Sequence, residues 1–284
     1  MVNGYVRLDD IVPIKSKSDI IFTNNNLYNF NLSQLDGTEK IAFRSSDFKP
    51  QANISGKHSF ITIANLVNDE IKNEERIRFR GYGIPLWDRY NGMEDPKLFN
   101  WRGNEWCLFA RPNYNISKII MMMINLDTKE YIYLDDPEGR PHTKNWMPYI
   151  DGNNLYFIVD VNPLSVYKLI GSKLFPIHKE KIKIDQRVIH GGSNLIKIDD
   201  RLVGIVHGMF ELVPENWFYW HSVMSCNEDW TGQRVGRSFF FEREGIEFCL
   251  SLSRNNKEIS IPYSVNDNGV SIIKIEEETF RNLL

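Results

Sequence analysis

The sequence has little that would carry it to a membrane or to nucleic acid. Its longest apolar stretch, residues 119–124, is far shorter than the roughly 20 residues that a membrane-spanning helix needs. The net charge is −3 and the pI is about 6.1. Strongly basic surfaces draw proteins to phosphate backbones and acidic lipids. We therefore expect no nucleic-acid partner and no insertion into a membrane.

Cysteine is also scarce, with only three residues in the chain. No pair of them has the spacing of zinc ligands, and the odd number argues against a disulfide framework. Cys107 and Cys249 lie within apolar runs and are predicted to be small core residues. Residues 1–14 carry Asp9 and Asp10 and lack the apolar centre of a signal peptide. These features predict a reducing, cytoplasmic location, no metal site and no required cofactor.

Helical patterning is nearly absent. Only residues 276–284 and 68–75 could form short helices. Apolar or alternating runs dominate instead, at residues 59–64, 105–110, 155–159, 202–206 and 259–265. Such runs, separated by polar turns, predict an all-β fold.

What the sequence does contain is a strand–turn–strand unit that recurs about every 50 residues, a period typical of propeller blades. Each copy joins two apolar runs through a tight polar turn, as β-hairpins do. The four copies span residues 96–110, 147–160, 193–207 and 248–265.

At this period the chain is long enough for five blades. We predict that residues 1–284 form a single five-bladed β-propeller domain. The first and least regular blade would contain strands at 59–64 and 77–80. The Asn-rich segment 15–40 would be a surface excursion ahead of that blade.

Charged residues stand where the first strand of the second blade begins. Glu94 and Asp95 precede Pro96, which fixes the backbone at the entry to the strand, and Lys97 follows. Two adjacent carboxylates can take separate roles, one binding a ligand and the other transferring a proton. The alternative is an ordinary turn acid ahead of a strand.

The same place in the next two repeats holds polar residues again. Lys144 and Asn145 could bind phosphate or sugar hydroxyls, and Trp146 could stack on a sugar, unless this is a surface loop with a buried Trp. In the third repeat His190 precedes the glycine pair 191–192. Those glycines could bring N–H groups close to an anion, although a tight turn would use them equally well.

A second set of polar residues follows the second strand of each repeat. Its members are Arg111, Asp160, His207 and Asp267. In an antiparallel hairpin this position lies at the same end as the start of the first strand, so both sets would meet on one face of the ring. Independent turns would not be expected to repeat this registration. His221 is a further candidate, although a single His inside a strand is more often a core residue.

Four segments, taken in order, resemble the five-bladed propellers of the β-mannoside phosphorylase and hydrolase family. They are residues 94–99, 191–196, 202–208 and 263–267. The likeness is closer still to a glycosyltransferase-associated branch of that superfamily, which also has segments similar to residues 144–148 and 246–248. The resemblance covers roughly residues 85–275.

The resemblance implies inverting transfer at a sugar anomeric carbon, with Asp95 as the catalytic residue. It also implies that Asp267 and His207 bind sugar or phosphate. Two departures are Lys97 and His190, which stand where arginines are usual. Because they disfavour a phosphate site built from several arginines, we expect an inverting glycosyltransferase that uses a nucleotide sugar and a glycan acceptor.

In that reaction Asp95 would be the general base that takes the proton of the acceptor hydroxyl. Lys144 and the histidines would neutralise the leaving diphosphate, which could also recruit a divalent cation. Asp160 and Asp267 would hold sugar hydroxyls. One alternative is a β-glycoside hydrolase or phosphorylase of the mannoside type, in which Asp95 protonates the leaving oxygen. A second alternative is a non-catalytic glycan-binding propeller.

Overall fold

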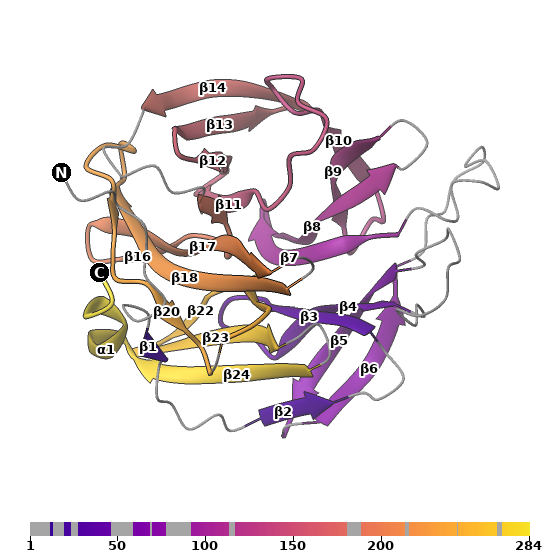
Figure 1. Cartoon of the computed structure of the whole chain (residues 1–284). Coiled ribbons are helices and arrows are strands. Elements are labelled where there is room, and N and C mark those ends of the chain that lie inside the picture. The colour runs from indigo at the N-terminus through magenta and orange to yellow at the C-terminus, as the bar shows by residue number, and fades with distance from the viewer. Residues whose placement is uncertain are drawn as a thin grey trace.

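Nearly all of the regular structure is β-strand. The computed structural model describes residues 12–13, 20–23, 28–46, 59–68, 70–77, 92–113, 117–180, 189–213, 216–242, 244–265 and 269–284. Within these ranges five sheets stand in a ring, and a single short helix, α1 (Glu277–Arg281), lies beside the fifth sheet (Figure 1). The predicted five-bladed β-propeller is confirmed.

The first three blades are four-stranded and follow the chain from the centre outwards. Blade 1 comprises β3 (Tyr28–Gln34), β4 (Lys40–Ser46), β5 (Ser59–Val67) and β6 (Glu70–Arg76). Blade 2 comprises β7 (Glu94–Trp101), β8 (Asn104–Asn113), β9 (Lys118–Asn125) and β10 (Tyr131–Leu134). Blade 3 comprises β11 (Met147–Asp151), β12 (Asn154–Val161), β13 (Leu164–Ile170) and β14 (Lys173–Glu180).

The last two blades take strands from both ends of the chain. Blade 4 comprises β15 (Ile189–Gly191), β16 (Ile196–Ile198), β17 (Arg201–Val213), β18 (Asn216–Asn227), β19 (Arg234–Val235), β20 (Phe239–Phe240) and β1 (Val12–Pro13). Blade 5 comprises β21 (Glu247–Cys249), β22 (Ser253–Asn255), β23 (Glu258–Val265), β24 (Gly269–Glu276) and β2 (Ile20–Thr23).

The segment 15–40 was expected to be a surface excursion, and its strands correct that expectation. β2 pairs antiparallel with β24 of blade 5, while β3 is the first strand of blade 1. The N-terminal part of the chain therefore joins the last blade to the first. A ring closed in this way has no free gap between its ends.

The predicted hairpins and the C-terminal helix are present. Turns at residues 102–103, 152–153 and 199–200 join paired strands, and β22 pairs with β23 across residues 256–257. Residues 68–75 were expected to be helical, but β6 runs through them as a strand. Of the strand expected at 77–80, only Ile77 lies within the described residues, and it is outside β6.

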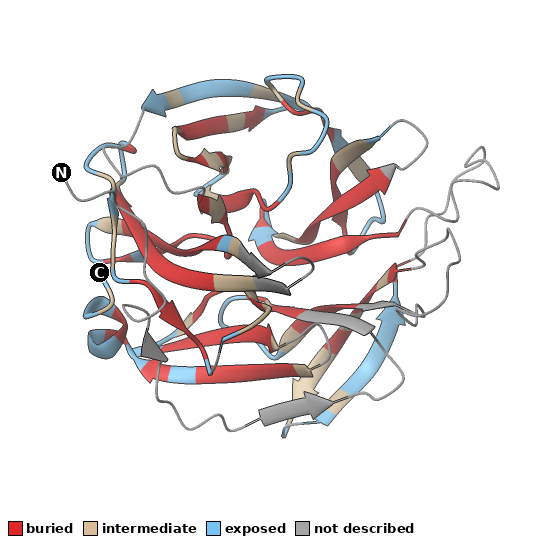
Figure 2. Ribbon diagram, in the orientation of Figure 1, coloured by how far each residue is buried: buried red, intermediate tan, exposed pale blue. Residues whose placement is uncertain are grey.

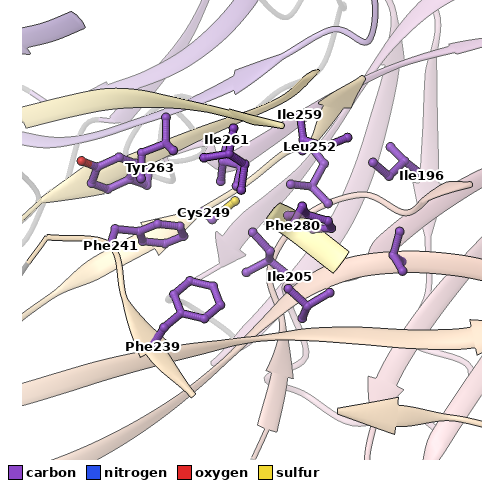
Figure 3. Close-up of a cluster of buried hydrophobic side chains, with 14 of the residues drawn as sticks. Ile196, Ile205, Phe239, Phe241, Cys249, Leu252, Ile259, Ile261, Tyr263 and Phe280 are labelled. Carbon is purple, nitrogen blue, oxygen red and sulfur yellow. The ribbon is translucent and has the colours of Figure 1, made fainter. Parts of the chain in front are cut away.

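Buried apolar side chains fill each of the five contacts between neighbouring blades. Figure 3 shows the cluster between blades 4 and 5, where Ile205 and Phe239 pack near Ile261 and Tyr263. The inner strands are accordingly buried, whereas the outer strands β6 and β14 are largely exposed (Figure 2). The core is thus a set of wedges between sheets, and it holds the inner strand ends in place around the centre.

All three cysteines are buried and unpaired, and the expected core positions of Cys107 and Cys249 are confirmed. No helix in the described part of the chain is long and apolar enough to cross a membrane.

Candidate active site

Asp95 lies at a local irregularity at the start of β7. Glu94 pairs with Ala110 and Lys97 with Leu108, so the strand carries one extra residue there. The backbone of Asp95 has a φ of +55°, in the left-handed region that costs a non-glycine residue about 1–3 kcal/mol. Such bulges redirect side chains next to active sites. Only 6% of the Asp95 surface is exposed.

Two cations from the neighbouring blades approach this carboxylate. The Nη2 of Arg44, on β4 of blade 1, donates to Oε1 of Glu94 at 2.8 Å, and its Nη1 lies 3.9 Å from Asp95 Oδ1. Lys144, just before β11 of blade 3, places Nζ 3.3 Å from Asp95 Oδ2 and 3.6 Å from Glu94 Oε2. Attraction to Asp95 is the main cause that raises the pKa of Lys144. The four groups therefore form one network that links three blades.

Asp95 opens onto a pocket of about 400 Å³, within the range of small-molecule sites. Residues from all five blades line it, so it lies where the blades converge. The lining residues are Arg44, Asp95, His142, Thr143, Lys144, Asn145, Val159, Asp160, Val161, Ile189, His190, Gly191, His207, Met209, Tyr219, Ile246 and Phe248.

One side of the pocket is formed by four ring side chains from blades 4 and 5. They are His190, His207, Tyr219 and Phe248. The ring centroid of His207 lies 4.8 Å from that of Phe248, 5.6 Å from His190 and 5.7 Å from Tyr219. Burial lowers the pKa of His190 and lowers that of His207 well below its usual value. The His207 side chain is buried, and its Nδ1 has no hydrogen-bond partner among the described residues. These histidines are therefore neutral at pH 7.

Asp160 also lines the pocket, at the end of β12. Its Oδ2 accepts a hydrogen bond from Arg140 Nη1 at 2.5 Å. Arg140 is held in turn by Asp136, whose Oδ2 lies 3.0 Å from Arg140 Nη2. Asp160 is thus a paired carboxylate at the rim of the site.

Lys97 and Arg111 are buried and do not line the pocket. Burial lowers the pKa of Lys97 to about 8, and the nearby Asp95 opposes that effect. Both residues were expected to bind substrate, but their positions limit them to acting from behind the pocket wall.

Two further expectations fail because the side chains belong to the core. Trp146 is fully buried and packs on Phe157, with ring centroids 5.9 Å apart, so it cannot stack on a sugar. His221 lies 4.5 Å from Phe241 and 6.0 Å from Phe239, ring centre to ring centre. Neither side chain lines the pocket.

The glycine pair serves chain packing rather than an anion. A Cβ at Gly191 would come 2.2 Å from the Asn145 carbonyl oxygen, and one at Gly192 would come 2.7 Å from that of Ile205. The N–H groups of Gly192 and Ser193 both donate to the Ile205 carbonyl. Those donors are therefore already used.

The remaining expectations are mixed. Lys144, Asn145, Asp160, His190 and His207 do meet Asp95 in one pocket, whereas Asp267 lies outside the described residues. Arg44 was missed, although a lone arginine inside the apolar run of β4 was a usable signal. Within the described ranges no group of three or more His, Cys, Asp or Glu residues could hold a metal ion.

No protein-family model matches the sequence, and no match is found among curated proteins. Solved structures do match. One comes from the GH130 family of mannoside phosphorylases, which contains glycoside hydrolases that target β-1,2-mannosidic linkages in Candida mannan. It has a TM-score of 0.62 and 13% identity, over 94% of this chain and 92% of that chain.

Two phosphorylases match equally well in shape. The β-1,2-mannobiose phosphorylase from Listeria innocua, in complex with β-1,2-mannobiose, has a TM-score of 0.62 and 12% identity, over 98% of each chain. MPT-4, a mannose phosphorylase from Leishmania mexicana in complex with phosphate, has a TM-score of 0.62 and 10% identity, over 95% of this chain and 91% of that chain. At such identities the likeness establishes a shared fold.

The expected glycosyltransferase is wrong. The matching structures are described as glycoside hydrolases and phosphorylases, and they include a GH43_1 enzyme from Xanthomonas citri. The segment 144–148 had pointed to the transferase branch, yet its Trp146 is a core residue. Without a glycosyltransferase reaction, there is no longer a reason to expect a nucleotide-sugar donor or a cation recruited by its diphosphate.

Proposed function

We propose that this protein cleaves β-glycosidic bonds in mannose-containing glycans, by hydrolysis or phosphorolysis. The observation that carries the proposal is a buried carboxylate, Asp95, held in a left-handed bulge on the wall of a pocket to which all five blades contribute. The mannosidic linkages named for the structural neighbours suggest the substrate class.

Asp95 would act as the general acid. Its proton passes to the glycosidic oxygen as the bond from that oxygen to the anomeric carbon breaks. An oxygen of water or of inorganic phosphate bonds to the anomeric carbon from the opposite face, which inverts the configuration. Inorganic phosphate attacks as an anion, whereas an attacking water must pass one proton to a carboxylate base. Asp160, the other carboxylate on the described pocket lining and a partner of Arg140, would accept that proton in hydrolysis.

Two buried polar atoms suit sugar hydroxyl groups. Asn145 Oδ1 and His207 Nδ1, in residues that line the pocket, are both buried without a hydrogen-bond partner in the described part of the chain. An unpaired buried polar atom costs about 1–3 kcal/mol, which a bound hydroxyl would recover. Both atoms are uncharged in these residues at pH 7, so they favour a neutral ligand such as a sugar.

The test is to incubate the protein with β-1,2-, β-1,3- and β-1,4-linked mannobiose, each with and without inorganic phosphate. Mannose alone would indicate hydrolysis, and phosphate-dependent mannose 1-phosphate would indicate phosphorolysis. Asp95→Asn is the matched control, because Asn also tolerates the left-handed backbone. Folded protein that releases neither product from any of the three substrates would refute the proposed function, and binding without turnover would identify a glycan-binding propeller instead.

A further inference from the structure

The charges around Asp95 are shared rather than paired one to one. Arg44 reaches Glu94 at 2.8 Å and Asp95 at 3.9 Å, and Lys144 reaches the same two carboxylates at 3.6 and 3.3 Å. Arg44 and Glu94 each keep only about a tenth of their side-chain exposure. Two cations and two carboxylates thus share one network beside the pocket, in which Lys144 is the most exposed member, with 40% of its side-chain exposure.

Other titratable groups lie on the elements around Asp95. They are Lys97 on β7, Arg111 on β8, His142 ahead of β11, Asp160 on β12, His190 on β15, His207 on β17 and Tyr219 on β18. Burial keeps His190 and His207 neutral at pH 7, and Asp160 is matched by Arg140. Arg44, Lys144 and Lys97 therefore attract negative charge on Asp95, and Glu94, which shares Arg44 and Lys144 with it, repels that charge.

This balance matters because a general acid must carry its proton before it reacts. Cations beside a carboxylate favour its charged form, and a second carboxylate favours the protonated form. If Arg44 and Lys144 had Asp95 as their only partner, they would hold it in the charged form that cannot donate. Glu94 competes for both cations and also repels negative charge on Asp95. Both effects therefore favour the protonated form of Asp95.

We propose that Glu94 is a positioning residue that keeps Asp95 able to take up a proton, by sharing Arg44 and Lys144 with it. The catalytic meaning of this role rests on the proposed function, which makes Asp95 the acid. The charge sharing itself does not depend on any substrate, so it can be measured without turnover.

The experiment is a pH titration by NMR of full-length protein labelled with ¹³C at the aspartate side-chain carboxyl carbon. Asp95→Asn identifies the Asp95 signal by its loss. In Glu94→Gln we expect the midpoint of Asp95 protonation to fall by about one pH unit or more, since removal of a nearby like charge has effects of that size. Glu94→Asp keeps the charge and should move the midpoint less.

Glu105→Gln is the matched control. Glu105 lies near the start of β8 and pairs with Lys40 at the start of β4. It therefore also joins blades 1 and 2, but at the far end of the strands that carry Ala110 and Arg44. In Glu105→Gln the midpoint of Asp95 protonation should equal that of the wild-type protein. An unchanged or raised midpoint in Glu94→Gln would overturn the proposal and reduce Glu94 to an anchor for Arg44.

A second variant guards against misfolding of Glu94→Gln. Lys144 keeps 40% of its side-chain exposure, so Lys144→Met should fold. It removes a cation, and the Asp95 midpoint should rise. A midpoint that stays in place would also overturn the proposal.

If β-mannosides are cleaved, the fall of kcat/KM at high pH should move to lower pH in Glu94→Gln, as the NMR midpoint does. Shifted midpoints without any cleavage would refute the proposed function and leave the charge sharing intact. Cleavage with unshifted midpoints would support the proposed function and refute the charge sharing by Glu94.

Discussion

The pocket has two unlike walls. The charged wall, Arg44, Asp95 and Lys144, comes from blades 1 to 3. Glu94, which was expected to bind substrate, is buried and does not line the pocket, but it pairs with these cations from behind the wall. Each of the four charges has an opposite charge within 4 Å. The ring wall, His190, His207, Tyr219 and Phe248, comes from blades 4 and 5 and is uncharged at pH 7. In the proposed function, the charged wall would transfer the proton, and the ring wall would contact the sugar through its flat side chains and the Nδ1 of His207, to which no described residue hydrogen-bonds. Reaction and recognition would then lie on different walls of the pocket.

The largest effect should come from the charged wall. Asp95→Asn should lower kcat for β-mannoside cleavage by about 10²- to 10⁴-fold, since the amide cannot donate the proton. The protein should still fold, because the two side chains are nearly the same size and Asn tolerates the left-handed backbone, and thermal unfolding checks this. Retention of a tenth or more of kcat would show that Asp95 is not the general acid. The charged wall would then have no special role in proton transfer.

Loss of Arg44 should show what the charged wall contributes to stability. Arg44→Met removes the cation that donates to Glu94 and lies 3.9 Å from Asp95, and we expect a loss of roughly 3 kcal/mol. That corresponds to a fall in melting temperature of about 6–12 °C. Lys40→Met, four residues earlier on β4, removes the partner of Glu105 in a pair whose side chains keep 30% and 27% of their exposure, and should cost at most about 1 kcal/mol. Equal losses would mean that the buried network has no special role.

Acid should act on the core behind the ring wall. His190, His207 and His221 lie directly opposite one another across β15, β17 and β18, and burial lowers the pKa of His221, the most buried of the three, to about 3. The unfolded chain binds this proton near pH 6.5, so folding stability falls as the pH drops from 6.5 towards 3, by about 1.4 kcal/mol for each unit. His221→Phe should remove that part of the slope, as measured by urea unfolding at pH 6.5 and 4.5. An unchanged slope would show that His221 is not buried as a neutral ring.

The smallest effect should come from the ring wall itself. His207→Phe keeps a ring against Phe248 and deletes only the nitrogens, so KM should rise about two- to tenfold with little change in kcat, the worth of one hydrogen bond. His178→Phe, on β14 outside the pocket, is the matched control and should leave both constants unchanged. A fall in kcat without a rise in KM would show that His207 takes part in the reaction step, and the proposed division of roles between the two walls would be wrong.

The sequence predicted the hairpins well because each combines two buried runs with a polar turn. It misjudged β6, since the outer strand of a blade is exposed on nearly every residue and shows no alternation. It also misjudged 15–40, because the pairing of β2 depends on residues 269–272 and leaves no local signal.

The sequence predicted where the site residues lie along the strands, but not the direction in which each side chain points. Position in the repeat brought Asp95, Lys144 and His207 to one end of the ring, and they do line one pocket. It did not specify which way a side chain points, so Trp146 and His221 were placed in the site although they fill the core. The partner that pairs with Glu94 could not be found without the contact between blades 1 and 2.

The pairing of β2 with β24 has a consequence for synthesis of the protein. Ile20 emerges from the ribosome about 250 residues before its partner, Ile272. At about 5–20 residues per second, β2 waits for roughly 12–50 s with its backbone donors and acceptors unpaired. An unpaired strand edge is a template for aggregation. The nascent chain therefore passes through a long period in which a chaperone would be of most use, and a chain truncated before residue 269 would never leave it.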